Sequence, residues 1–162
     1  MPAMTHNVFV FGTLKRGQPN FYLLEDASNG LAVHLADGIT EEKFPVVIAS
    51  RCNIPFMLPV AGKGKNVVGE IYKVDDSMLN RLDILERKAE ILDRREINVV
   101  SNGRAITCWC YHLVNHKKEL QELPTIDNYD TNGSHGLPYI PNSLETCDNF
   151  SDVQIQNKQD DK

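Results

Sequence analysis

One carboxylate, Glu86, lies where the pattern of its helix predicts an apolar residue. Residues 77–87 are predicted to form a helix, with Asp75 or Asp76 as the N-cap. At about 100° per residue, four apolar side chains fall within an arc of roughly 120°, a stripe that faces a core: Met78, Leu79, Leu82 and Leu85. Glu86 falls inside this arc, whereas Asp83 lies at its rim. The pattern therefore directs one acidic side chain toward the interior.

Two interpretations of Glu86 remain open from the pattern alone. Helix ends often depart from their periodicity, so the helix can fray at Leu85 and leave Glu86 in solvent. Alternatively, Glu86 stays partly buried near the helix C-terminus, where the macrodipole disfavours negative charge. Burial also disfavours the ionised form and moves the pKa of a carboxyl group toward values useful for proton transfer. In the second interpretation Glu86 is a candidate general base.

A second candidate site is the turn Phe11-Gly12-Thr13-Leu14, which follows a predicted strand at 7–11. Glycine in such a turn lets the backbone approach a ligand closely, and successive N–H groups can converge on an anion. An ordinary turn from strand to loop is the simpler interpretation of so short a motif. The turn is not a phosphate-binding loop, because the Gly-rich spacing and the following Lys-Ser/Thr are missing.

The elements expected to position these residues are mainly strands. Alternation and apolar runs predict strands at 31–36, 46–48 and 67–74, and Asn102-Gly103 predicts a hairpin between strands at 96–100 and 105–113. A short helix is expected from Pro19 to about Asp26. Many strands with few helices indicate an α+β fold, a mixed sheet closed or curled into a small β-barrel with helices packed outside.

The length and composition of the chain fit one compact domain. At 162 residues, with 41% hydrophobic and 24% charged residues, the chain is long enough for one sizeable core. We expect a domain at 1–142 and a polar, acidic, flexible tail at 143–162. The net charge of −5 argues against nucleic acid as a partner. No apolar run is long enough to cross a bilayer, so no membrane association is expected.

The cysteines and histidines suggest neither a metal site nor a redox site. With no export signal, we expect reduced thiols and a cytoplasmic location for a chain with four cysteines: Cys52, Cys108, Cys110 and Cys147. The histidine separations match no metal-ligand pattern: His34, His112, His116 and His135. We expect no metal and no cofactor. Trp109 and Tyr111 alternate with cysteines on a strand, and packing suffices to explain them.

A longer stretch of the sequence, of which the turn is part, resembles a known family far more specifically than the turn alone. The string at 8–20, Val-Phe-Val-Phe-Gly-Thr-Leu-Lys-Arg-Gly-Gln-Pro-Asn, resembles the opening of the gamma-glutamylamine cyclotransferases, a branch of the gamma-glutamylcyclotransferase superfamily. The resemblance continues through Asn-Ile-Pro-Phe at 53–56, Gly-Glu-Ile-Tyr-Lys-Val-Asp at 69–75 and Leu-Asp-Ile-Leu-Glu at 82–86, then Tyr129-Asp130, His135-Gly136-Leu137 and Tyr139. It covers nearly all of residues 7–142.

The resemblance implies a fold, a reaction and roles for residues. Family members are small mixed barrels that cleave gamma-glutamyl amides without metal or organic cofactor. The substrate's α-amine attacks its own γ-carbonyl, which releases 5-oxoproline and a free amine. By this resemblance Glu86 is the catalytic base, and Phe11, Gly12, Thr13 and Leu14 bind the anionic end of the substrate. Ile54 and Phe56 are expected to line the cavity beside Glu86.

The chain departs from the family pattern at three positions. Phe11 replaces the usual tyrosine, Arg87 replaces a small residue, and Leu92 replaces the tyrosine of a Tyr-x-Arg motif whose arginine, Arg94, is kept. The expected protein is a monomeric enzyme acting on gamma-glutamyl-ε-lysine or a related small-molecule amine, with gamma-glutamyl-amino acids or glutathione as other possible substrates. The alternatives are a catalytically silent member that binds a small ligand or a protein, and a protein that acts through a partner bound at residues 144–162.

Overall fold

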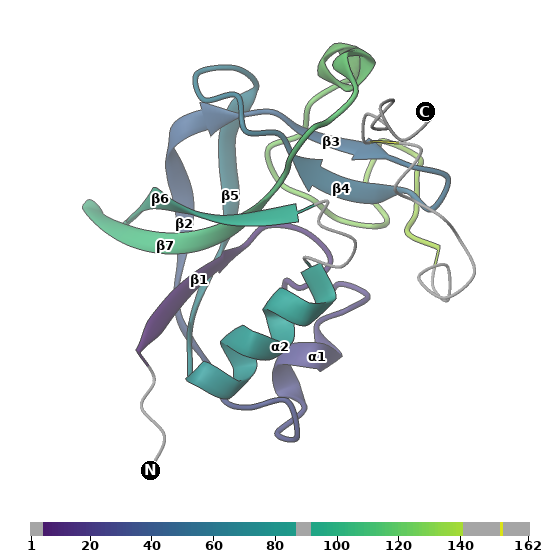
Figure 1. Ribbon diagram of the computed structural model, residues 1–162. Coiled ribbons are helices and arrows are strands. Elements are labelled where there is room, and N and C mark those ends of the chain that lie inside the picture. Colours follow the sequence, from purple (N-terminus) through teal and green to yellow (C-terminus); the bar gives the residue numbers. More distant parts are fainter. Residues whose placement is uncertain (1–4, 87–91, 141–152, 154–162) are drawn as a thin grey trace, which may run out of the picture.

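The computed structural model describes residues 5–86, 92–140 and 153 of the 162-residue chain. A closed barrel contains β1 (His6–Val10), β5 (Lys65–Val74), β2 (Ala32–Phe44), β6 (Leu92–Ser101) and β7 (Arg104–Leu113), in that spatial order. The helices α1 (Tyr22–Glu25) and α2 (Asp76–Glu86) lie together on one side of the barrel (Figure 1). A two-stranded sheet of β3 (Val46–Ala49) and β4 (Ile54–Met57) lies beside it, and a 3₁₀ helix spans Lys118–Glu122. The predicted α+β barrel is confirmed.

The first strand, β1, closes the barrel and is buried on both faces. It pairs antiparallel with β5 from His6↔Val74 to Val10↔Glu70, and parallel with β7 at Val8↔Trp109. Val8 and Val10 belong to the core cluster under α2, whereas Phe9 belongs to the cluster inside the barrel. Burial on both faces explains why this strand is a continuous apolar run instead of an alternating pattern.

Two local signals in the sequence act as predicted. Asn102 and Gly103 have positive φ values of 51° and 77°, as a two-residue hairpin turn requires, and this turn sets the register of β6 against β7. Asp75 is the N-cap of α2, since its Oδ1 accepts the N–H of Met78 at 2.9 Å. The same oxygen accepts the N–H of Leu31 at 3.1 Å, which ties the start of the helix to the chain entering β2.

The structure differs from the predicted elements at β2, β4, β6 and α1; β6 begins at Leu92 instead of the predicted residue 96. β2 extends to Phe44, far beyond the predicted 31–36, and register shifts against β5 interrupt its alternation. β4 was not predicted because a proline, Pro55, stands inside it; its partner strand β3 is short, and both strands lie outside the barrel. The helix expected from Pro19 to Asp26 is reduced to Tyr22–Glu25, preceded by turns.

The cysteines divide into two kinds. Cys108 and Cys110 are free and buried, and burial raises the pKa of the Cys108 thiol to about 12, which keeps it protonated and unreactive. Cys52 is disulfide-bonded, so the expectation of reduced thiols is wrong at this residue. Of the four cysteines, Cys147 lies outside the described residues.

One residue of the predicted tail packs against the domain. Val153 is fully buried in a cluster with Val47 and Leu113, and its carbonyl accepts the N–H of Lys117 at 2.8 Å. Val153 is the one described residue of the segment 143–162, so the flexible tail stays a prediction. The remaining residues of that segment lie outside the described part of the chain.

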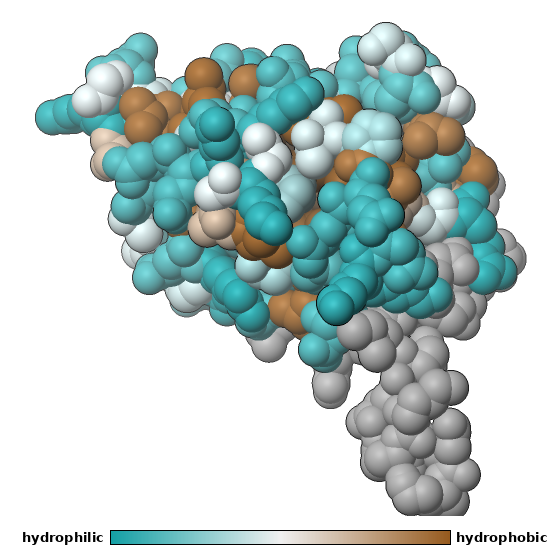
Figure 2. Space-filling model, turned by 90° about the horizontal axis from the view of Figure 1, so that it is seen from above, coloured by the Kyte–Doolittle hydropathy of each residue, from teal (hydrophilic) through white to brown (hydrophobic). Residues whose placement is uncertain are grey.

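The face seen in Figure 2 is mostly hydrophilic, with hydrophobic residues in separate small groups. Within the described residues, no helix has both the length and the apolar character needed to cross a membrane.

His112 makes the stability of the fold sensitive to acid. It is buried on β7, packs edge-on against Phe44, and burial lowers its pKa to about 4 from 6.5. The unfolded chain takes up this proton as the pH falls through 6.5, whereas the folded chain does not until about pH 4. The unfolded state thus binds more protons between these values. As the pH is lowered from 6.5 to 4, this group alone decreases the free energy of unfolding by about 3 kcal/mol.

We predict that His112→Gln flattens the loss of unfolding free energy between pH 6.5 and pH 4, because the variant has no proton to gain in either state. Urea denaturation of both proteins across this range measures the effect. Parallel pH dependences for the variant and the wild type would contradict it.

Candidate active site

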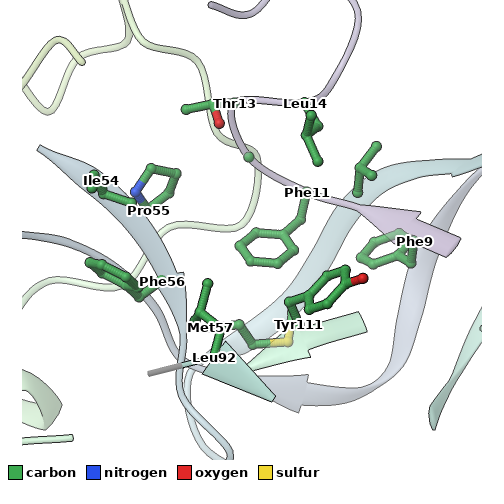
Figure 3. Close-up of a pocket in the computed structure, with 12 residues that line it drawn as sticks. Phe9, Phe11, Thr13, Leu14, Ile54, Pro55, Phe56, Met57, Leu92 and Tyr111 are labelled. Carbon is green, nitrogen blue, oxygen red and sulfur yellow. The ribbon is translucent and has the colours of Figure 1, made fainter. Parts of the chain in front are cut away.

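A pocket opens where the chain leaves β1 at the end of the barrel. Its volume is about 70 Å³, and its wall is mostly apolar (Figure 3). Three parts of the chain form it: the end of β1 with the following loop, the strand β4, and the facing ends of β6 and β7. The lining residues are Phe9, Val10, Phe11, Gly12, Thr13, Leu14, Ile54, Pro55, Phe56, Met57, Leu92 and Tyr111.

The pocket brings together most of the residues that the sequence singled out. All four predicted binding residues line it, Phe11 to Leu14, and so do Ile54 and Phe56. Leu92, one of the departures from the family pattern, lies in the same wall. In Figure 3 the ring of Phe11 lies among Pro55, Met57 and Tyr111.

The neighbouring Pro55 leaves no room for a side chain at Gly12. A Cβ at this position would lie 2.9 Å from Cγ of Pro55, closer than real side chains pack. Gly12 is not one of the glycines with positive φ, so backbone conformation is not the reason. The absence of a side chain lets the loop approach β4, and this contact closes one side of the pocket.

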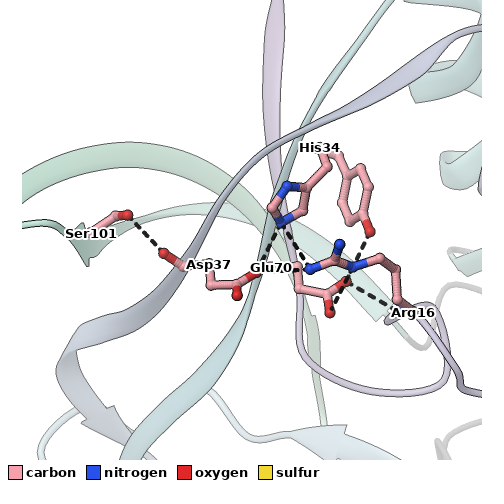
Figure 4. A network of polar contacts seen from close by, with 6 residues as sticks. Arg16, His34, Asp37, Glu70 and Ser101 are labelled. Carbon is pink, nitrogen blue, oxygen red and sulfur yellow. Dashed lines mark hydrogen bonds and ion pairs between the residues drawn. The ribbon is translucent and has the colours of Figure 1, made fainter.

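A partly buried carboxylate holds the loop after Gly12 against the barrel. The side chain of Glu70 is only 13% exposed. Its Oε1 accepts the backbone N–H of Arg16 at 3.0 Å and the hydroxyl of Tyr72 at 2.8 Å. The Arg16 guanidinium extends over this carboxylate toward Asp37 and His34 (Figure 4). Glu70 and Arg16 together fix where the loop returns to the sheet.

Lys15 fixes the same loop from its other side. The residue is 7% exposed, and its Nζ donates to Oδ1 of Asn128 at 2.6 Å. Burial lowers the pKa of this ammonium group, while the charges of Glu70 and Asp130 act in the opposite direction. The loop is therefore anchored by a buried cation as well as by a partly buried anion.

Two backbone donors beside the pocket have no partner among the described residues. Among the hydrogen bonds of the described residues, none has the backbone N–H of Thr13 or Leu14 as its donor. The other groups of Thr13 are satisfied, since its carbonyl accepts the N–H of Asn20 at 2.8 Å and its hydroxyl accepts the Asn20 amide at 3.0 Å. The loop thus presents two N–H groups in a fixed conformation, the arrangement that anion-binding turns use.

The wall formed by Tyr111 is held by a carboxylate on α2. The Tyr111 hydroxyl donates to Oδ1 of Asp83 at 2.6 Å. Arg94 faces the same carboxylate, with 2.9 Å between Nε and Oδ1 and 3.2 Å between Nη2 and Oδ2. The C-terminal part of α2 is therefore connected directly to the pocket wall.

Glu86 is the last residue of α2, one helical turn after Asp83. Its side chain is not among the described groups, so its catalytic role stays a prediction. Arg87 lies outside the described residues. In the part of the chain that is described, no three His, Cys, Asp or Glu side chains gather where they could hold a metal ion.

Comparisons with known proteins agree with this architecture. Residues 8–131 match the family model for gamma-glutamyl cyclotransferase, AIG2-like. The chain belongs to this family. Gamma-glutamylaminecyclotransferase C of Danio rerio is 42% identical over 84% of this chain and 93% of its own. Gamma-glutamylaminecyclotransferase of Homo sapiens is 40% identical over 83% of this chain and 95% of its own. The crystal structure of an AIG2-like protein from Mus musculus superposes with a TM-score of 0.81 at 42% identity, over 84% of this chain and 95% of that one.

Three residues around the pocket were not predicted from the sequence as parts of one arrangement: Asp83, Arg94 and Tyr111. Tyr111 was assigned to packing, and Asp83 was noted only at the rim of the helical stripe. A signal for two of them was present. A two-residue turn at Asn102-Gly103 places Arg94 directly across from Tyr111, the observed register.

We predict that Gly12→Ala lowers the free energy of unfolding by about 1–3 kcal/mol, the usual range for an added methyl group in a packed site. The cause is the contact with Pro55, so the loss should shrink in a Pro55→Ala background. Urea denaturation of the four proteins of this double-mutant cycle measures the coupling. An equal loss in both backgrounds would show that Pro55 is not what excludes a side chain at position 12.

Proposed function

We propose that this protein is a gamma-glutamylamine cyclotransferase. It would cleave gamma-glutamyl-ε-lysine, or a related small-molecule gamma-glutamylamine, to 5-oxoproline and a free amine. The observation that carries the proposal is the pocket at the end of β1, lined by the Phe-Gly-Thr-Leu turn of a family member. Relatives named gamma-glutamylaminecyclotransferase that are about 40% identical along most of the chain support the amine as the leaving group.

The proposed reaction is intramolecular and needs neither water nor a cofactor. The α-amine nitrogen of the substrate bonds to its γ-carbonyl carbon, and the amide bond from that carbon to the leaving nitrogen breaks. Glu86 takes the proton lost by the attacking amine and returns it to the departing amine, so the enzyme is unchanged at the end. Such a lyase-type cleavage gains most from holding the substrate curled, because orientation removes much of the entropic barrier.

The described residues support distinct parts of this proposal. The N–H groups of Thr13 and Leu14 are suited to an anionic end of the substrate, since neither donates to another described group. The apolar wall from Ile54 to Met57 excludes water from one side of the pocket. Phe11 and Leu92 give this pocket fewer hydroxyl groups than the family pattern implies. We therefore propose Phe11, Gly12, Thr13 and Leu14 as binding residues and Glu86 as the catalytic residue.

A cytoplasmic location and a monomeric state complete the proposal. The free thiols of Cys108 and Cys110 agree with a reducing compartment, whereas the disulfide at Cys52 does not. Fractionation of cells that express the tagged chain tests the location, and sedimentation of the pure protein tests the monomer.

We predict that the pure protein forms 5-oxoproline from gamma-glutamyl-ε-lysine and that Glu86→Gln lowers kcat by about 10²–10⁴-fold, the usual contribution of a positioned general base. Gln keeps the size of the side chain but cannot accept the proton. Mass spectrometry of 5-oxoproline and of free lysine, formed in equal amounts, is the measurement.

Glu96→Gln is the matched control, because Glu96 is an exposed carboxylate on β6 that lines no part of the pocket. It should keep the wild-type rate. Product from wild type and from Glu86→Gln at equal rates would remove Glu86 from the mechanism. If gamma-glutamyl-ε-lysine, gamma-glutamylalanine and glutathione all gave no product, the protein would be a silent binder, and Phe11→Tyr with Leu92→Tyr would be the first reversions.

A further inference from the structure

Three elements meet at the carboxylate of Asp83. This carboxylate lies on α2, its ion-pair partner Arg94 lies on β6, and its hydrogen-bond donor Tyr111 lies on β7. The side chains of Asp83 and Arg94 are each 20% exposed, so solvent screens this pair less than a pair at the open surface. Nη2 of the guanidinium donates to Oδ2 of the carboxylate at 3.2 Å, and Nε lies 2.9 Å from Oδ1 as an ion-pair contact without hydrogen-bond geometry.

The partners of Asp83 are themselves held in place. Arg94 and Tyr111 are direct cross-strand neighbours on β6 and β7. The guanidinium carbon of Arg94 lies 4.3 Å from the centroid of the Trp109 ring, a cation–π contact that restrains the arginine from its other side. Tyr111 is 7% exposed and lines the pocket. The carboxylate thus binds two groups that cannot easily move away from it.

The position of Asp83 along α2 connects this cluster to the proposed base. Residue 86 follows residue 83 by one helical turn, so anything that fixes Asp83 also fixes the backbone of the last turn. The described part of α2 reaches Glu86, so Asp83 lies in its last described turn. At the other end of the helix the N-cap Asp75 restrains the first turn, since it accepts the N–H of Met78. At the C-terminal end Leu82 packs into the core cluster with Val8 and Tyr111, and Asp83 adds a directional polar contact to the barrel strands.

We propose that Asp83 is a positioning residue for the cyclotransferase reaction: through Arg94 and Tyr111 it locks the last turn of α2 and the Tyr111 wall of the pocket in one fixed relation. The inference rests on the proposed function, because it assigns the locked turn a task in catalysis. This arrangement would align Glu86, the proposed base, with a substrate bound against Tyr111. Asp83 itself need not touch the substrate.

The same helix offers a matched control. Asp76, in its first turn, reaches back to β1 through a hydrogen bond with His6 at 2.6 Å, but its side chain is 93% exposed. Asp76→Asn therefore also removes a carboxylate that connects α2 to a barrel strand, at the end far from the pocket. A general weakening of the helix would appear in both variants, whereas loss of positioning would appear only in Asp83→Asn.

We predict that Asp83→Asn lowers kcat for gamma-glutamyl-ε-lysine by about 10–100-fold, with KM changed less than about threefold, because small misplacements of reacting groups cost rate more than binding. Asp76→Asn should leave both parameters within about twofold of wild type. Tyr111→Phe should lower kcat less than Asp83→Asn, and adding it to Asp83→Asn should cause little further loss, since the two share one interaction.

Arg94→Lys and Arg94→Ala form a second comparison. Lysine keeps the charge but loses the planar fork, so it should restore part of the kcat that alanine loses. Equal kcat values in these two variants would contradict a role for the geometry of the pair. A change of KM alone in Asp83→Asn, or a fall in kcat that Asp76→Asn matches, would overturn the proposal.

Hydrogen exchange gives a readout that does not depend on activity. In Asp83→Asn the amides of residues 83–85 should exchange at least about fivefold faster, while those of Met78 and Leu79 stay as in wild type. Unchanged exchange at 83–85 would overturn the proposal whatever the kinetics. If the wild type formed no 5-oxoproline, the proposed function would fail by itself, and faster exchange would still support Asp83 as the residue that orders this turn.

Discussion

β1 has only five residues, yet it forms ladders on both of its edges, antiparallel to β5 and parallel to β7. Without it the sheet would have two open edges and no enclosed core. Its inward residue Phe9 fills the barrel, and its outward residues Val8 and Val10 form the floor on which α2 packs. Because β1 ends at Val10, the following turn is fixed at the rim of the barrel, and the pocket is located there.

Charged groups around the pocket hold its parts in place. Glu70, Lys15 and Asp83 are all largely buried, and each connects a loop or helix to a barrel strand or a neighbouring segment. Burying such groups is unfavourable unless every one is paired. Each has a partner at 3.0 Å or less, at the backbone of Arg16, at Asn128 and at Tyr111. The pocket wall itself can then remain apolar.

Local signals in the sequence predicted the parts of the fold that depend on neighbours in the chain. The hairpin at Asn102-Gly103, the N-cap at Asp75 and the strand 67–74 depend on turn chemistry, capping and alternation, and all three appear in the structure. β4 and the full length of β2 were not predicted. A proline breaks the periodicity of β4, register shifts break that of β2, and both strands are stabilised by their partner strands. The turn at Phe11–Leu14 was singled out by its glycine after a strand, and its proposed binding role came from the resemblance to a family.

The cluster around Asp83 could not be found from periodicity. It joins residues 83, 94 and 111, and their proximity follows only once α2 is packed across the β6–β7 hairpin. The hairpin register supplies the pair of Arg94 and Tyr111, but no local pattern shows which helix covers it. The contact of Gly12 with Pro55 is hidden for the same reason, since it is a requirement for space between distant segments.

The parallel contact between Val8 and Trp109 also has a consequence for how the chain is made. About 100 residues separate these partners, so closing the barrel requires a long loop to form first, which slows folding. During synthesis the apolar strand β1 leaves the ribosome early, whereas β7 follows only after most of the domain. Until then one edge of β1 has no native partner and is open to pairing with other chains. Pairing of β1 with β5 covers the opposite edge, so this edge stays open until β7 has been made.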